Sequence, residues 1–454
     1  MITSAKPDLA AVVDDIQLPP EFSDEALALR FSEQHSDDLR FTAAWAKWSL
    51  WNGVRWLRDD TLHVFDMART ITRTASSECS ERQNEGVARR VASAQSVAAV
   101  ERLARADRRH AATVEMWDAD LWLLNTPTGV VDLHTGRIQE HRREHYITKM
   151  TAVGPGGDCP LWLRFLHRIT DDDRELESFL QRMIGYALTG STREHALFFL
   201  YGVGANGKSV FLTTISGLLA DYAKTAATAS FTASRTEQHP TDLAGLCGAR
   251  FVTAIETESD RRWAEAKIKA LTGGDKISAR YMRQDFFEFV PAFKLVVAGN
   301  HKPGLRTVDE AIKRRLHLIP FTVTIPEHER DKNLAEKLQT EWPGILAWAI
   351  NGALDWQRTG LKPPTAVRKA TEDYFADEDT FGRWLGECCV LGSKYQTTSA
   401  ALFENYRSWA ESAGEYVISQ RRFSRALQER GITLGRTAAH RFLVGVAPRP
   451  DAER

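Results

Sequence analysis

The sequence predicts an α/β protein with a central mixed domain and further domains on either side, and three observations support this. An apolar run at residues 196–201 leads into a glycine-rich turn, and a helical pattern follows at 210–219. Two more apolar runs, 250–255 and 293–298, predict buried strands, and polar residues follow each of them. An amphipathic helix is expected at 175–189, just before the first run.

Residues 1–150 form the first predicted domain, in which Ser23 is a plausible helix N-cap. Four tryptophans follow in close succession: Trp45, Trp48, Trp51 and Trp56. A helix would place Trp45 and Trp48 on one face, and Asn52-Gly53 is typical of a hairpin turn. Such tryptophans could stack on single-stranded bases. We favour the alternative, that they form the core of a small domain.

An arginine-rich, predicted helical region covers residues 67–113. It is either a DNA-facing surface or a solvated helical face, and we favour the second. Residues 121–138 predict short strands and turns, and the Gly-Pro-Gly-Gly segment at 154–157 predicts a loop and a boundary. A helical connector is expected at 160–195, before a core at 196–360.

The glycine-rich turn, GVGANGKS at residues 202–209, fits the pattern G-x-x-x-x-G-K-[ST] at every fixed position. Lys208 would reach the β- and γ-phosphates of a nucleoside triphosphate, and the Ser209 hydroxyl would hold Mg²⁺. A chance match in a loop is the alternative, and the flanking strand and helix argue against it. The predicted nucleotide-binding residues are Gly202, Gly204, Ala205, Asn206, Gly207, Lys208, Ser209 and Val210.

The next two predicted strands end in side chains suited to this chemistry. Residues 250–255 lead to Glu256 and Glu258, where a carboxylate would coordinate Mg²⁺ or orient water. A solvated acidic strand end is the alternative. Residues 293–298 lead to Asn300, whose amide could report the γ-phosphate, although by itself it is better explained as a turn asparagine.

Between these strands the pattern predicts a basic hairpin, with strands at 276–280 and 286–289. It carries Lys276, Arg280 and Arg283, with Tyr281 at or near its tip. Cationic side chains neutralise phosphates and an aromatic ring stacks on bases, which suits sequence-independent contact with a single strand. An ordinary exposed hairpin is the alternative.

Arg314 and Arg315 precede one more apolar strand, where an arginine could neutralise charge on a neighbouring subunit's nucleotide. Either could equally be a salt-bridge partner. A break at 361–364 precedes the last predicted domain, 380–454, in which helices end in a strand pair at 432–436 and 441–444.

The composition is that of an ordinary globular protein, with 43% hydrophobic and 26% charged residues and a formal net charge of −1. No global charge draws the chain to DNA or a membrane. The five cysteines show no zinc spacing, which favours reduced thiols in a cytoplasmic protein. Neither a signal peptide nor a membrane span is expected.

Together the motifs resemble a superfamily 3 helicase of the phage and plasmid (poxvirus-like) primase–helicase group. The resemblance is close over about 165–325 and rests on five segments: GVGANGKS, FVTAIETE, KALTGGDKISARY, FKLVVAGNHKP and AIKRRLHLIPF. The preceding region resembles the α+β accessory domain of this group, and the tail resembles its winged-helix segment less closely.

This resemblance implies an AAA+-like α/β core, a homo-hexameric ring, and ATP- and Mg²⁺-dependent 3′-to-5′ movement on single-stranded or forked DNA. Lys208 and Ser209 would be Walker A, Glu256 and Glu258 Walker B, and Asn300 the sensor. Lys276 and Arg280 would be the main DNA contacts of the hairpin. Arg314 or Arg315, with Arg315 slightly favoured, would be the arginine finger acting in trans.

The sequence departs from the pattern of this family in two ways, which limit how far the family's roles can be assigned to its residues. Thr257 separates the Walker B acids, so their roles stay open. About 150 residues precede the helicase module, so no primer synthesis is expected, and a separate primase or initiator would be a partner. An initiator that melts or marks an origin without processive unwinding is the main alternative. A ring ATPase acting on protein is another, against which the basic hairpin argues.

Overall fold

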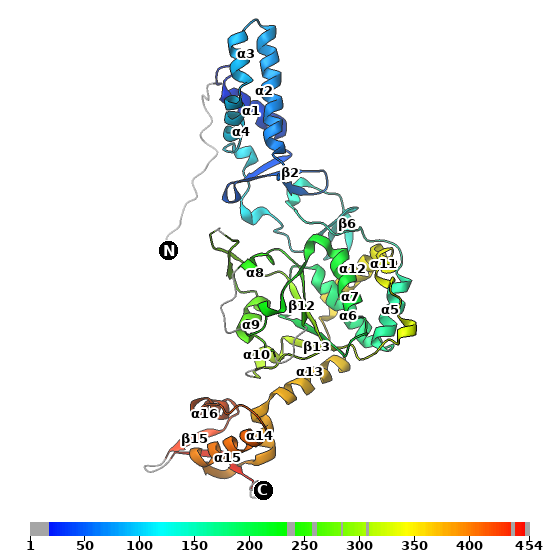
Figure 1. Ribbon diagram of the computed structural model, residues 1–454, viewed down its shortest axis with the longest axis vertical. Coiled ribbons are helices and arrows are strands. Elements are labelled where there is room, and N and C mark those ends of the chain that lie inside the picture. Colours follow the sequence, from blue (N-terminus) through cyan, green and yellow to red (C-terminus); the bar gives the residue numbers. More distant parts are fainter. Residues whose placement is uncertain are drawn as a thin grey trace. The chain divides into compact units, whose positions relative to one another are not determined.

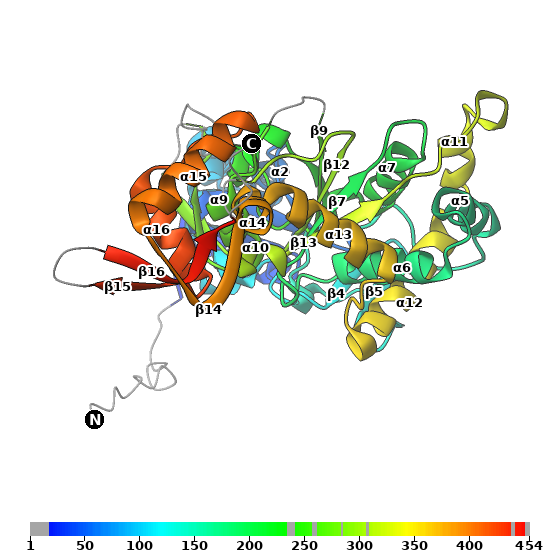
Figure 2. The same cartoon turned by 90° about the horizontal axis from the view of Figure 1, so that it is seen from below.

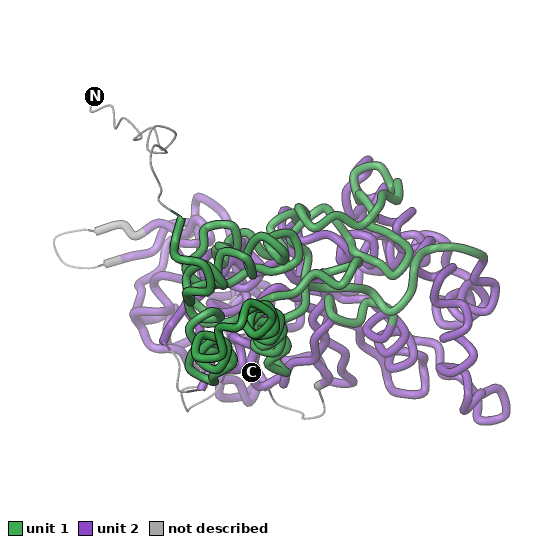
Figure 3. Tube along the Cα trace, turned by 90° about the horizontal axis from the view of Figure 1, so that it is seen from above, with its two compact units in different colours: residues 1–157, 218–222 green, residues 158–217, 223–454 purple. Residues whose placement is uncertain are grey.

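The computed structural model describes residues 18–233, 241–256, 261–282, 285–305, 308–436 and 441–449. The chain divides into two compact units (Figure 3). The first comprises residues 1–157 and 218–222, and the second comprises 158–217 and 223–454.

The first unit combines a helical bundle with two three-stranded antiparallel sheets, β1-β2-β3 and β4-β5-β6 (Figure 1). The Ser23 side chain accepts a hydrogen bond from the Ala26 amide at 3.2 Å, which confirms the expected N-cap. The elements are α1 (Asp24–His35), β1 (Leu39–Thr42), η1 (Ala43–Trp45), β2 (Lys47–Trp51), β3 (Trp56–Arg58), α2 (His63–Glu81), α3 (Glu85–Val91), α4 (Ala94–Ala104), η2 (Arg108–His110), η3 (Val114–Met116), β4 (Leu123–Thr126), β5 (Gly129–Asp132), β6 (Arg137–Gln139) and η4 (Arg143–His145).

The tryptophan-rich segment is not a helix, so the expectation that Trp45 and Trp48 share a helix face is wrong. Trp45 ends the short η1, whereas Trp48 lies in β2, paired with Phe41 of β1. Strand pairing on both sides of β2 outweighs the helix-like spacing of the tryptophans. Trp48 is buried and its indole N–H donates to Glu101 at 2.6 Å. Trp56 is also buried, as expected for tryptophans that form a core.

The second unit is built on a parallel five-stranded sheet of order β13-β7-β12-β9-β8. The strands expected at 196–201, 250–255 and 293–298 are confirmed as β7, β9 and β12. The elements of this core are β7 (Leu197–Tyr201), α7 (Lys208–Leu219), β8 (Ala223–Thr225), η6 (Thr228–Ser230), α8 (Thr241–Ala244), β9 (Phe251–Glu256), α9 (Glu265–Gly273), β10 (Ile277–Ala279), β11 (Phe287–Phe289), β12 (Lys294–Gly299), α10 (Glu310–Lys313) and β13 (Leu316–Pro320). The short η5 (Ala220–Tyr222), which follows α7 in sequence, belongs to the first unit.

Further helices precede and follow the core in sequence (Figures 1 and 2). They are α5 (Pro160–Thr170), α6 (Arg174–Leu188), η7 (Glu327–Glu329), α11 (Leu334–Gln339), α12 (Trp342–Thr359) and α13 (Thr365–Glu378). α6 packs on α5 and α12, and α13 packs on β13. The contact between α6 and α12 is close because both carry a glycine. A Cβ on Gly185 would lie 2.0 Å from the Ala353 nitrogen, and one on Gly352 would lie 2.1 Å from the Gln181 oxygen.

The C-terminal segment has its own apolar core, which includes the buried side chains of Trp384, Tyr406 and Phe423. Its sheet has the order β14-β16-β15 and is antiparallel, and the expected pair at 432–436 and 441–444 is confirmed as β15 and β16. β14 was not expected. The elements are α14 (Thr380–Cys388), β14 (Cys389–Thr398), α15 (Ser399–Ser412), α16 (Gln420–Glu429), β15 (Thr433–Arg436) and β16 (Arg441–Pro448).

Candidate functional site

The glycine-rich turn joins the carboxyl end of β7 to the first residue of α7. Its backbone has positive φ at Gly202 (156°), Gly204 (92°), Ala205 (49°) and Gly207 (84°). A turn that combines residues of positive and negative φ can direct successive N–H groups toward one concave side, which favours anions. The following helix adds the positive end of its dipole at the same place.

Two of these glycines are required by close contacts. A Cβ on Gly202 would lie 2.0 Å from the Phe321 carbonyl oxygen. A Cβ on Gly207 would lie 2.6 Å from Cγ2 of Ile169, a residue of α5. The turn is therefore held between the segment after β13 and a helix that precedes the core, and only glycine fits at these positions.

The Lys208 side chain is buried at 7% exposure and points back over the turn. Its Nζ donates to the Gly202 carbonyl at 2.7 Å and to Oδ1 of Asn206 at 3.1 Å, and it lies 3.5 Å from Oδ1 of Asn300. Burial lowers the pKa of Lys208 because it penalises the charged ammonium. A polyanion in the turn would compensate that penalty, so the surroundings of Lys208 suit a phosphate group.

The carboxyl ends of three neighbouring strands meet beside this turn. Tyr201 of β7 pairs with Gly299 of β12, and Gly299 pairs with Glu256 of β9. Asn300 directly follows β12, which explains its proximity to Lys208. The fold thus places Lys208, Asn300 and the backbone of Glu256 at one edge of the sheet. Glu258 lies outside the described residues.

Ser209 and Val210 occupy the first turn of α7, and Ser209 is exposed. A hydroxyl at this position and a carboxylate at the end of β9 are hard oxygen ligands of the kind that Mg²⁺ prefers. The residue types present therefore fit a magnesium nucleotide.

Arg314 and Arg315 lie at the opposite edge of the sheet, because they precede β13 and the strands are parallel. Arg315 is 7% exposed, donating from Nη1 to the Ala311 carbonyl at 2.8 Å and from Nε to Oγ1 of Thr272 at 3.3 Å. Burial lowers its pKa, with a smaller effect from Arg314. Arg314 is exposed. This geometry argues against the preference for Arg315, because the residue is buried and two of its three guanidinium nitrogens donate within its own chain.

The expected basic hairpin is confirmed as an antiparallel pair of β10 and β11, with Ser278 opposite Glu288. The Lys276 side chain is 71% exposed and its Nζ lies 3.8 Å from Oε2 of Glu288. The Arg280 guanidinium lies over the Phe286 ring, 4.8 Å from its centroid. Arg283 lies outside the described residues.

Tyr281 does not present a free ring at the tip. Its hydroxyl donates to the Ala244 carbonyl at 3.0 Å, and its ring stacks on Phe287 at 5.6 Å between centroids. Phe286 is the more exposed aromatic side chain of this segment, at 59% against 43% for Tyr281. Sequence reasoning missed Phe286. The alternation in Phe286-Phe287-Glu288-Phe289 signals that Phe286 and Phe287 face opposite sides of a strand, but not which side is exposed.

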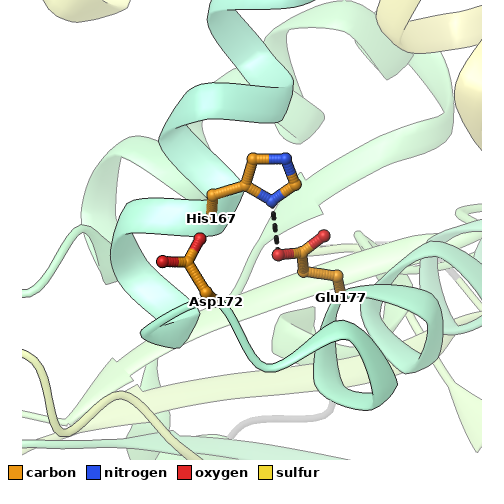
Figure 4. A group of neighbouring side chains, drawn as sticks. All are labelled: His167, Asp172 and Glu177. Atoms are coloured by element: carbon orange, nitrogen blue, oxygen red, sulfur yellow. Dashed lines mark hydrogen bonds and ion pairs between the residues drawn. The ribbon is translucent and has the colours of Figure 1, made fainter.

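A separate group beside the loop between α5 and α6 has the spacing of metal ligands: one ligand atom each of His167, Asp172 and Glu177 lies within 4.8 Å of the others (Figure 4). Nδ1 of His167 is 2.5 Å from Oε1 of Glu177. However, Nη1 of Arg174 lies 3.0 Å from Nε2 of His167 and 3.3 Å from Oε2 of Glu177. A guanidinium already supplies positive charge here, so we interpret the group as a polar network that joins α5 to α6.

Two family models match parts of the chain. The model described as "D5 N terminal like" matches residues 28–171, and the one described as "Family of unknown function (DUF5906)" matches residues 200–315. The second match covers the glycine-rich turn, the hairpin and both arginines that precede β13.

Three viral relatives are named "Putative helicase": L207/L206 of Acanthamoeba polyphaga mimivirus, 022R of Frog virus 3 (isolate Goorha) and 184R of Invertebrate iridescent virus 6. They are 26%, 25% and 27% identical to the chain over 269, 264 and 318 residues. The matches cover 55%, 53% and 60% of this chain, but only 28%, 27% and 32% of the relatives. These similarities support a relation to D5-type viral helicases.

Two apo structures of the NrS-1 C-terminal region resemble most of the chain in fold. One has a TM-score of 0.51 and covers 94% of this chain and 100% of its own, and the other has 0.53, with 93% and 99%. Both are 9% identical in sequence, so they support the mixed α/β fold alone. The parallel sheet is consistent with a P-loop-like core. Within the described part of the chain, no helix is long and apolar enough to cross a membrane.

Proposed function

We propose that the chain is an ATP-dependent DNA helicase of superfamily 3. It would move 3′-to-5′ along single-stranded DNA as a hexameric ring. One observation carries the proposal. Lys208, Asn300 and the end of β9 lie together at one edge of the parallel sheet, and the same core includes the basic hairpin. The names of the viral relatives support the same class of enzyme.

In this proposal the turn at 202–207 and the first residues of α7 hold the triphosphate of ATP. Backbone N–H groups would donate to phosphate oxygens, and Lys208 would exchange its bonds to Gly202 and Asn206 for the β- and γ-phosphates. Ser209 and Glu256 would hold Mg²⁺, and Glu256 or Glu258 would orient the attacking water. ATP, when bound, supplies the phosphoanhydride bond whose hydrolysis drives movement.

Asn300 would link nucleotide state to the rest of the core. Its Oδ1 lies 3.5 Å from the ammonium of Lys208, and it directly follows β12. The hairpin lies between β9 and β12 in sequence, and Lys294 begins β12 a few residues after the hairpin ends. A shift of Asn300 toward or away from a γ-phosphate would therefore act on the same strand that follows the hairpin.

Arg314 would complete the site of a neighbouring subunit. It is exposed and lies at the sheet edge opposite its own glycine-rich turn, so it suits a contact with another copy of the chain. Arg315 would instead hold α9 and the start of β13 together through Thr272 and Ala311.

The test is ATP hydrolysis with and without single-stranded DNA, beside displacement of a forked duplex that bears a 3′ tail. Stimulated hydrolysis with displacement is expected. A matched fork with a 5′ tail tests direction, and equal displacement of both forks would contradict 3′-to-5′ movement.

A second candidate function is an origin-binding initiator without processive unwinding, and α16 favours it. The C-terminal order α14-β14-α15-α16-β15-β16, with the sheet order β14-β16-β15, supports a winged-helix-like domain. On α16, Arg421, Arg422 and Arg425 are exposed, as in helices that enter a major groove. Tight duplex binding without fork displacement would favour this function over the first.

A further inference from the structure

The hairpin formed by β10 and β11 exposes apolar side chains next to its cationic ones. Met282 is 69% exposed, Phe286 59% and Val290 52%. Single exposed apolar residues are common on proteins, but here three lie within nine positions of one short hairpin. The partner of this surface must therefore offer apolar area as well as charge.

Tyr281 and Phe286, both at this end of the hairpin, differ in how many contacts hold their rings. Tyr281 is fixed at both ends, because its hydroxyl donates to Ala244 of α8 and its ring stacks on Phe287. Among the described residues, no aromatic ring stacks on Phe286, and its one cationic neighbour is Arg280. Tyr281 thus anchors the hairpin to the core, whereas the Phe286 ring is available to a partner.

The contact between Arg280 and Phe286 prepares the ring for an unpaired base. A guanidinium over the ring restricts the orientation of Phe286 through a cation–π contact and leaves the rest of the ring exposed. The charge of Arg280 lies beside the ring and that of Lys276 at the other end of the same strand pair, and both would attract a polyanion. Single-stranded DNA presents both a phosphate chain and flat bases, whereas duplex DNA keeps its bases stacked.

We propose that Phe286 stacks on an unpaired DNA base and that Arg280 is the residue that positions its ring. This inference rests on the proposed function, since it assigns a role within the DNA-contacting hairpin. Phe286 thus replaces Tyr281 as the residue expected to stack on DNA. Stacking on the face of a base would let the hairpin bind the strand without dependence on its sequence.

The test compares binding of the full chain to a thymidine oligonucleotide and to an abasic oligonucleotide of equal length. Both carry the same phosphates, but only the first offers bases. Fluorescence anisotropy at several salt concentrations gives the affinity and its salt slope. We expect the wild type to bind the thymidine strand about five- to a hundredfold more tightly, which is the range for loss of one stacked base.

Phe286→Ala should lose this preference, binding the thymidine strand about five- to a hundredfold more weakly and the abasic strand nearly as before. The salt slope should not change, since no phosphate contact is removed. Phe286→Leu should behave like Phe286→Ala, because it keeps apolar area without a ring, and Phe286→Tyr should restore binding. Tyr416→Ala removes a comparably exposed aromatic outside the hairpin, at 71%, and should change neither affinity.

Three outcomes would overturn the inference. Equal binding of the two strands by the wild type would show that bases are not contacted, while leaving DNA binding by the hairpin intact. An equal loss on both strands for Phe286→Ala would show a general effect on the hairpin. Binding of neither strand by the wild type would overturn the proposed function along with the inference. Thermal unfolding of each variant establishes that it is folded.

Discussion

The glycine-rich turn and the hairpin use lysine in opposite ways. Lys208 is 7% exposed and contacts two oxygens of its own turn, whereas Lys276 is 71% exposed and lies 3.8 Å from one carboxylate. A buried cation held by fixed partners suits a ligand of one shape. An exposed cation on a long side chain suits a polymer that must slide past in many registers. The core thus combines one site of defined geometry with one adaptable surface.

The largest expected effect belongs to the buried lysine. Lys208→Ala should lower ATP hydrolysis at least about 10⁴-fold, because it removes the charge beside the β- and γ-phosphates. Steady-state phosphate release is the measurement, and Lys332→Ala, which removes an exposed lysine, is the control. Near-normal turnover of Lys208→Ala would mean that the turn is not the nucleotide site.

The two arginines before β13 should separate into different phenotypes. Arg314→Ala should lower hydrolysis about 10³-fold with an unchanged melting temperature, since the side chain is exposed. Arg315→Ala should instead destabilise the fold by about 1–3 kcal/mol, because it removes buried hydrogen bonds.

Mixed assemblies sharpen this comparison. Subunits with Lys208→Ala but an intact Arg314 should restore hydrolysis to Arg314→Ala subunits when the two are mixed. If mixing restores nothing, or if Arg315→Ala is the inactive but stable variant, the assignment of Arg314 as the trans residue is wrong.

For the exposed surface we expect a moderate effect that depends on salt. The double variant Lys276→Ala with Arg280→Ala should bind single-stranded DNA about tenfold more weakly. The slope of log affinity against log salt concentration should become shallower by about 1.4, because two phosphate contacts are lost. The stimulation of hydrolysis by DNA should fall in parallel. Arg368→Ala with Lys369→Ala, two exposed cations of α13, is the matched control. An unchanged slope in the hairpin variant would exclude phosphate contacts there.

The smallest effect tests how rigidly the turn is held. The Cβ of Gly204→Ala would meet no neighbouring atom, but alanine at this positive φ should lower the free energy of unfolding by about 1 kcal/mol. Gly207→Ala should cost about 1–3 kcal/mol more, because its Cβ would collide with Ile169 of α5. Urea unfolding of both variants gives the difference. The addition of Ile169→Ala should recover part of the loss for Gly207→Ala, and equal costs for both glycines would show that α5 does not constrain the turn.

The sequence predicted the site where backbone geometry restricts the residue type. The glycines and Lys208 are recognisable because the turn excludes Cβ atoms and buries the ammonium, and the parallel strands then bring Asn300 to the same edge. Exposure and side-chain partners are less visible in a sequence. Tyr281 and Phe286 are similar residues in one hairpin, and contacts that the sequence does not reveal distinguish them. Tyr281 bonds Ala244 and stacks on Phe287, whereas Phe286 is the more exposed ring.

The two errors in predicting secondary structure have a related cause. Trp45 and Trp48 have helical spacing, yet pairing of β2 with β1 and β3 decides the local structure. β14 was missed because it pairs with β16, about fifty residues later, and little in residues 389–398 marks a buried strand. In both cases long-range pairing outweighs local propensity.

The most direct test of the central claim is ATP hydrolysis by the full chain with and without single-stranded DNA, run beside displacement of a 3′-tailed fork. The account predicts that DNA stimulates hydrolysis and that the fork is opened. Hydrolysis that is indifferent to DNA, with no strand displaced, would contradict the helicase proposal and favour an ATPase that acts on protein.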